Sequence, residues 1–161
     1  MERVTLDTNI LPADDLIAAV PSDGFEFGVV SVTDRELRAS VALVPPSSVS
    51  RVPETLVLGE SVLGGAVLGG PGDGDCLERV LRIVGDGSFP SLGQRELLTE
   101  GQRHQLRDAM ILCAHVRAKR HIFVTNDERG FVRGGRREQL EHAFATRIMT
   151  RGEFLSKYAE K

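Results

Sequence analysis

The sequence feature that most constrains the fold is an alternation of short β-like runs with helix-forming segments, seen at both ends of the 161-residue chain. Val4 to Leu6 is a short β-like run that ends at Asp7, and Leu11 to Val20 carries helix formers up to the turn-forming Pro21-Ser22-Asp23-Gly24. Phe25 to Val32 is rich in aromatic and β-branched residues, which favour a strand. This order of elements predicts a parallel sheet with crossover helices.

Two capping-box patterns predict where further helices begin. Thr33-Asp34-Arg35-Glu36 predicts a helix that ends before Pro45-Pro46, and Thr99-Glu100-Gly101-Gln102 predicts one that runs to about Arg120. Eleven of the 17 glycines fall between Gly59 and Gly101. The segment from about 45 to 98 is therefore expected to form short helices and loops whose course the sequence does not define.

The alternation resumes after the second of these helices, which contains six consecutive apolar residues and should be buried on more than one side. His121 to Val124 predicts a strand that ends at Thr125-Asn126-Asp127, and a basic loop follows. Arg147 to Met149 then leads into a closing helix, Arg151 to Tyr158. We expect one domain over residues 1–161, with the α/β class of a three-layer α/β/α sandwich around a central, mainly parallel sheet.

Charge and hydropathy say little about partners. The formal net charge of -3 comes from 20 basic and 23 acidic side chains, a balance that does not by itself indicate nucleic-acid binding. Met1 to Asp7 lacks the charged-then-apolar layout of a signal peptide, and the apolar stretches are shorter than the roughly 20 residues of a spanning helix. No membrane association is expected.

Cysteine usage bears on the compartment. Cys76 and Cys113 are the only cysteines, and they are far apart and not in metal-ligand spacing. We expect neither a disulfide framework nor a zinc site, and this favours a reducing, cytoplasmic location.

Two acidic residues directly follow predicted strands. Asp7 and Asp127 should lie together, because the carboxyl ends of parallel strands open onto the crevice where such folds bind ligands. The alternative interpretation is that each aspartate is an Asx-turn or helix-cap residue.

Asp108 and Glu36 are the other acidic candidates. The residues three and four positions from Asp108 include no Lys or Arg, and a carboxylate beside a buried apolar face is costly without a partner. Asp108 could instead point to solvent or meet a distant arginine. Glu36 could be no more than the last member of its capping box.

Taken together, four segments resemble the signature of the PIN-domain family in order, type and context. They are Asp7-Thr8-Asn9-Ile10, Ser31-Val32-Thr33 with Glu36-Leu37, Arg107-Asp108-Ala109, and Phe123 to Asp127. The resemblance runs from about Val4 to Tyr158 and is thin in the glycine-rich middle. It implies that Asp7, Glu36, Asp108 and Asp127 form one catalytic, metal-binding cluster, supported by the polar residues Asn9, Thr125 and Asn126.

The expected chemistry follows from the ligand type. Oxygen-only ligands suit Mg²⁺ or Mn²⁺, which can orient an attacking water and neutralise charge on a phosphorus. Basic residues flank the Asp127 strand and are candidates for gripping RNA phosphates, with solvated surface charge as the alternative. They are Arg117, Lys119, Arg120, Arg129, Arg133, Arg136 and Arg137.

The sequence therefore favours a metal-dependent endoribonuclease. The family resemblance adds a VapC-like toxin with a small antitoxin-like partner, and a homodimer. One alternative is a catalytically silent PIN fold that acts as an RNA-binding or interaction module. A haloacid-dehalogenase-type Mg²⁺ phosphatase ranks low, because that family needs a second aspartate where Asn9 stands.

Overall fold

The computed structural model describes residues 1–31, 47–61 and 66–160, and a five-stranded sheet lies at its centre. The strand order is β3-β2-β1-β6-β7, and all four neighbouring pairs are parallel. The strands are β1 (Glu2–Leu6), β2 (Phe25–Val30), β3 (Ser50–Val52), β6 (Ile122–Val124) and β7 (Arg147–Met149). The predicted strands at Val4, Phe25 and His121 are thus confirmed, and β7 forms at Arg147–Met149, where no strand is predicted from the sequence.

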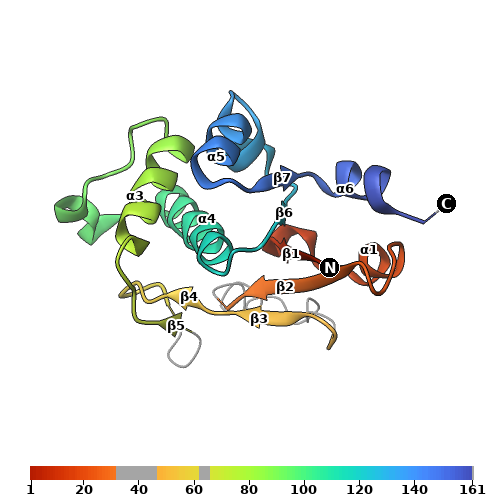
Figure 1. The fold of residues 1–161 in the computed structure, drawn as a ribbon. Helices are drawn as coiled ribbons and strands as arrows, with labels where there is room; N and C mark the ends of the chain where they lie inside the picture. Colours follow the sequence, from red (N-terminus) through yellow and green to blue (C-terminus); the bar gives the residue numbers. More distant parts are fainter. Residues whose placement is uncertain (32–46, 62–65, 161) are drawn as a thin grey trace.

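Helices cover both faces of this sheet (Figure 1). One face carries α3 (Asp73–Val84), α4 (Glu100–Arg117) and α5 (Arg136–Phe144), and the other carries α1 (Asp14–Ala18) and α6 (Arg151–Tyr158). The β6 side chains alternate between the two cores, as successive residues of a strand must. Phe123 packs under α4, whereas Ile122 and Val124 pack under α1 and α6. The predicted three-layer α/β/α sandwich is confirmed.

Helix α4 begins where the capping box predicted. The Thr99 hydroxyl accepts a hydrogen bond from the Gln102 backbone N–H at 3.2 Å, and the Gln102 side chain accepts one from Thr99 N–H at 2.9 Å. Residues Ala109 to His115 are all buried, which confirms burial on more than one side. The helix ends at Arg117 instead of about Arg120, because the chain turns at Lys119 with a positive φ of 50°.

The helices next to the two strand ends differ from expectation. In place of one helix from Leu11 to Val20, η1 (Thr8–Ile10) is followed by the short α1. Pro12 lies between them, where its missing N–H and ring disfavour a continuous helix. The basic segment after Asp127 is not a loop. It forms η3 (Glu128–Val132) and α5, joined by Gly134 and Gly135, which both have positive φ.

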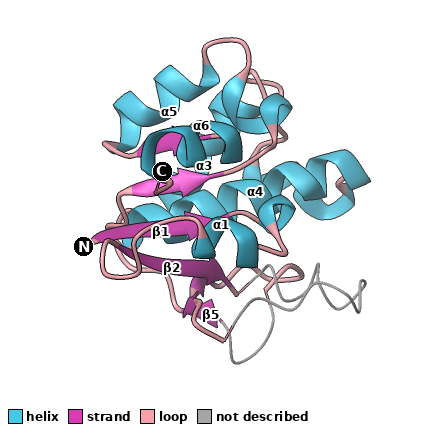
Figure 2. Ribbon diagram, turned by 90° about the vertical axis from the view of Figure 1, so that its right-hand side faces the viewer, coloured by secondary structure: helices cyan, strands magenta, loops and turns pink. Residues whose placement is uncertain are grey.

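The glycine-rich middle contains more order than its composition indicates. It includes the 12-residue helix α3, the 3-10 helix η2 (Leu92–Leu97), and a second, two-stranded parallel sheet of β4 (Glu54–Thr55) and β5 (Ala66–Val67). Helix α3 lies alongside α4 (Figure 1). Figure 2 shows β5 beyond β2, on the side away from β1. The helix predicted from Thr33 to before Pro45 lies outside the described residues.

The expectation that the two cysteines form no disulfide is wrong. Cys76 on α3 and Cys113 on α4 form a disulfide, with Cα atoms 6.0 Å apart. Their separation of 37 residues concealed the pairing, because only the packing of α3 against α4 brings them together. Within the described ranges, no helix combines the length and apolar character needed to cross a membrane.

Candidate functional site

The acidic strand ends meet at the point where the strand order reverses direction. From β1 the chain continues to β2 and β3 on one side, whereas β6 and β7 extend the sheet on the other side. Open α/β sheets bind ligands at this switch point, outside the carboxyl ends of the strands. Leu6 pairs with Val124, and Asp7 N–H donates to the Val124 carbonyl at 2.9 Å. Asp7 and Thr125 therefore leave the sheet side by side.

Asp7 is held by several hydrogen bonds in a buried position. Its side chain is almost fully enclosed, with the residue 3% exposed. Carboxylate Oδ2 accepts from the Thr125 hydroxyl at 2.6 Å and from the Asn9 amide at 2.7 Å, and Oδ1 accepts from Thr8 N–H at 2.8 Å. The orientation of this carboxylate is therefore fixed by its neighbours.

The three predicted supporting residues join the two strand ends. The Thr125 hydroxyl accepts from Asp127 N–H at 3.0 Å while it donates to the Asp7 carboxylate, so it links that carboxylate to the Asp127 backbone. Asn126 N–H donates to the Asn9 side-chain carbonyl at 2.8 Å. Asn9, Thr125 and Asn126 thus belong to one hydrogen-bonded network with Asp7 and Asp127.

Asp127 occupies a more open position at the start of η3. It is half-buried, and its Oδ1 accepts from Gly130 N–H at 2.9 Å. A Cβ at Gly130 would overlap the Asp127 carboxylate, so the turn depends on this glycine. The capping interpretation accordingly describes part of what Asp7 and Asp127 do, since each accepts a local backbone N–H.

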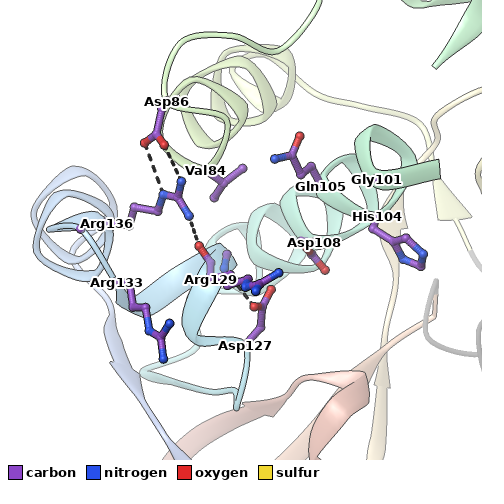
Figure 3. A pocket seen from close by; sticks show the side chains of 12 residues that line it. Val84, Asp86, Gly101, His104, Gln105, Asp108, Asp127, Arg129, Arg133 and Arg136 are labelled. Atoms are coloured by element: carbon purple, nitrogen blue, oxygen red, sulfur yellow. Dashed lines mark hydrogen bonds and ion pairs between the residues drawn. The ribbon is translucent and has the colours of Figure 1, made fainter. Parts of the chain in front are cut away.

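An open groove with a volume of about 840 Å³ lies between α4 and η3. Asp108 from α4 and Asp127 both line it, and Figure 3 shows their side chains directed into it with that of Arg129. His104 and Gln105 line the same wall as Asp108. Asp7 connects to this groove through Thr125. Glu36, the fourth predicted member, lies outside the described residues.

The candidate metal ligands suit a partly hydrated ion better than an ion enclosed by protein groups. Within the part of the chain that the structure describes, no three His, Cys, Asp or Glu side chains are close enough to hold a metal ion together. A closed protein cage therefore does not fit these residues. Hydrated Mg²⁺ needs only one or two carboxylates, with waters and substrate phosphates completing its shell. Asp108 and Asp127, which line the groove, could supply the carboxylates of that second mode, whereas Asp7 is buried and does not line the groove.

The two arginines before β6 belong to the scaffold. Arg120 is only 6% exposed, and its guanidinium donates to the Val4 and Glu26 carbonyls at 2.9 and 2.7 Å and to the Glu26 carboxylate at 2.8 Å. Arg117 donates to Thr55 at 2.5 Å and to the Pro53 carbonyl. Lys119 is exposed, but it precedes β6 and so lies at the amino end of the strand, opposite Asp127. The prediction that Arg120 is available to RNA is wrong, because this side chain is buried and used internally.

The basic residues after β6 lie nearer the acidic site. Arg129, Arg133 and Arg136 line the groove, whereas Arg137 pairs with Glu153 at 2.8 Å outside its lining. Arg136 also forms an ion pair with Asp86, at 2.6 Å. Asp86 follows α3 and lies in the glycine-rich segment, whose course the sequence does not define.

Sequence reasoning passed over two groove residues on α4. His104 and Gln105 line the groove beside Asp108, although neither residue is a candidate from the sequence. A usable signal was present, because residues three and four positions before Asp108 share its helix face.

Searches of protein-family models, curated protein sequences and solved structures find no match to this chain.

Proposed function

We propose that the chain is a divalent-metal-dependent endoribonuclease whose active site is the groove between α4 and η3. The observation that carries the proposal is the hydrogen-bonded connection from Asp7 through Thr125 to Asp127 at the switch point of the sheet. It places an oriented acidic pair next to a groove that Asp108 enters from the other side.

The side chains of the site would have different roles. Thr125 and Asn9 orient the Asp7 carboxylate, while Asp108 and Asp127 present oxygen ligands to the groove. A bound Mg²⁺ or Mn²⁺ would supply an oriented, more acidic water and offset charge that develops on the phosphorus. Arginines on the η3 side would offset the repulsion between the RNA phosphates and the acidic wall.

The resemblance to PIN domains is part of this proposal, and it rests on the sequence segments around Asp7, Asp108 and Asp127. By the same resemblance we propose a VapC-like toxin with a small antitoxin-like protein partner and a homodimer. The cytoplasmic location expected from the two cysteines loses that support, because Cys76 and Cys113 form a disulfide. Growth arrest on expression, relieved by a co-expressed small neighbouring protein, would support the toxin role. Unimpaired growth would count against it.

The second candidate is an RNA-binding or interaction module without catalysis. One observation favours it: the Asp7 carboxylate already accepts three hydrogen bonds from Thr125, Asn9 and Thr8. A carboxylate engaged in this way has fewer lone pairs for a metal ion.

An RNA cleavage assay separates the two candidates. Purified protein would be incubated with structured and unstructured RNAs in Mg²⁺, in Mn²⁺ and in chelator. Endonucleolytic products that appear with metal and vanish with chelator are the result expected of the nuclease. RNA that binds the protein but stays intact under every metal condition would favour the silent module.

A further inference from the structure

The three arginines that line the groove differ in how they are paired. Arg133 forms an ion pair with Glu128 at 2.6 Å, and Arg136 forms one with Asp86 at 2.6 Å. Arg129 is exposed, and its side chain makes no hydrogen bond or ion pair with any other residue in the described ranges. Figure 3 shows its guanidinium directed into the groove with Asp108 and Asp127.

Pairing decides which of these cations is available to an incoming anion. A guanidinium that already faces a carboxylate has part of its charge offset, and it must share or give up that partner to bind a phosphate. Arg129 has no such partner among the described residues. Its charge is therefore the most available of the three.

The backbone on both sides of Arg129 is held by hydrogen bonds and by packing. Arg136 donates from its guanidinium to the Arg129 carbonyl, while the next residue, Gly130, donates its N–H to Asp127. Phe131 is fully buried and packs edge-to-face on Phe123, with ring centroids 5.1 Å apart. The turn that carries Arg129 is thus anchored from the strand end, from the core and from α5.

We infer that Arg129 is the residue that contacts an RNA phosphate in the groove, beside Asp108 and Asp127, and that Arg136 with Asp86 positions it. The inference rests on the proposed function for the identity of the anion. Arg136 is a positioning residue because its guanidinium is used between Asp86 and the Arg129 carbonyl. It acts on the phosphate through Arg129.

The first test measures binding of a short single-stranded RNA to the full chain over a series of salt concentrations, in chelator so that the RNA stays intact. Arg129→Ala should weaken binding roughly tenfold or more and reduce the slope of log K against log salt by about one. Arg133→Ala is the matched control, an exposed arginine of the same groove that is paired with Glu128. It should weaken binding less than about threefold.

The second test asks whether Arg136 acts through Arg129. Arg136→Ala should weaken binding in the wild-type background and have little further effect in Arg129→Ala, since residues that act through one contact are not additive. Asp86→Asn should give a smaller loss with the same dependence on Arg129. Arg136→Lys keeps the charge and serves as a second variant if Arg136→Ala folds poorly.

The outcomes separate this inference from the proposed function. An unchanged salt slope in Arg129→Ala, equal losses in Arg129→Ala and Arg133→Ala, or no RNA binding by the wild type would each overturn the inference. Additive losses in the double variant would overturn the positioning role of Arg136. RNA binding with the predicted slopes but no metal-dependent cleavage would refute the nuclease and leave the phosphate contact standing.

Discussion

The core around β1 and β6 and the groove beyond their carboxyl ends contain the same three kinds of ionisable side chain in opposite environments. In the core the side chains are enclosed and hydrogen-bonded to other protein groups, and in the groove they are half-buried or exposed. The three matched pairs, with the core member first, are Arg120 and Arg129, His115 and His104, and Asp7 and Asp127.

The comparison shows that residue type alone does not tell whether a side chain supports the fold or faces the groove. Arg120 and Arg129 flank the same strand, yet one bonds to Val4 and Glu26 while the other enters the groove. What separates them is the number of internal partners and the cost of removing each group from water. Each pair can be tested by making the same change on both sides.

The histidine pair should give the largest effect. Burial lowers the pKa of His115 to about 3, with the nearby Arg120 and His121 charges acting in the same direction. Because the folded protein favours neutral His115, its contribution is complete above the unfolded pKa of about 6.5 and is lost as the pH falls toward 3. The loss should reach the order of 4 kcal/mol over that window.

Unfolding free energies measured from pH 7 to pH 3 would check this. His115→Gln can still bond to Thr5 and Thr146, the two hydroxyl partners, but does not titrate, so its curve should be flatter than the wild-type curve. His104→Gln is the control on the exposed face of α4. Identical pH slopes in wild type and His115→Gln would contradict the assignment.

The arginine pair should give the next largest effect. Arg120→Ala removes three hydrogen bonds and leaves the Val4 and Glu26 carbonyls without that donor, at a cost of about 3 kcal/mol. Arg129→Ala should change the unfolding free energy by less than about 0.5 kcal/mol, as ordinary surface substitutions do. Chemical denaturation of both variants measures the difference, and similar values for the two would erase the distinction between core and groove.

The aspartate pair tests the two strand ends. Asp7→Asn keeps the shape but replaces an acceptor oxygen with an amide donor among the donors from Thr125, Asn9 and Thr8, so a loss of about 2 kcal/mol is expected. Asp127→Asn can still accept from Gly130 through its amide oxygen and should lose about 0.5 kcal/mol. Thermal unfolding in chelator measures both. A greater loss at Asp127 would mean that the buried strand end is the less constrained of the two.

Gly130→Ala should have a smaller effect on stability, about 1 kcal/mol, but a specific effect on the groove. The added Cβ would overlap the Asp127 carboxylate, so the carboxylate or the η3 turn must shift. RNA cleavage per folded molecule should fall, since Asp127 and Arg129 both depend on this turn. Gly134→Ala faces open space but has a positive φ of 67°, so it controls for backbone strain without the overlap. Normal cleavage in Gly130→Ala would show that the turn tolerates the shift.

Much of the fold follows from local sequence signals. The strand ends at Asp7 and Asp127 and the capping box at Thr99 were predictable, because short apolar runs and cap chemistry act within a few residues. The disulfide was not predictable, because it depends on how α3 packs on α4. Helix α5 was missed because it buries only Leu140 and so carries almost no periodic pattern.

The candidate site divides in the same way. Topology explains why Asp7 and Asp127 meet, since parallel strands bring their carboxyl ends to one edge. The sequence alone could not show which arginines are buried and which face the groove. Whether Arg120 or Arg129 is buried depends on the course of the backbone near Val4 and Glu26, and the pairing of Arg136 depends on where Asp86 lies.

The most direct test of the central claim is Mn²⁺-dependent RNA cleavage per folded molecule, measured for wild type, Asp108→Asn and Asp75→Asn. Asp75 is the matched control, an exposed aspartate on the first turn of α3 that does not line the groove. The account predicts that Asp108→Asn loses most cleavage, about a hundredfold or more, while Asp75→Asn stays near wild type. Near-normal cleavage by folded Asp108→Asn would contradict the assignment of the groove as a metal-dependent active site.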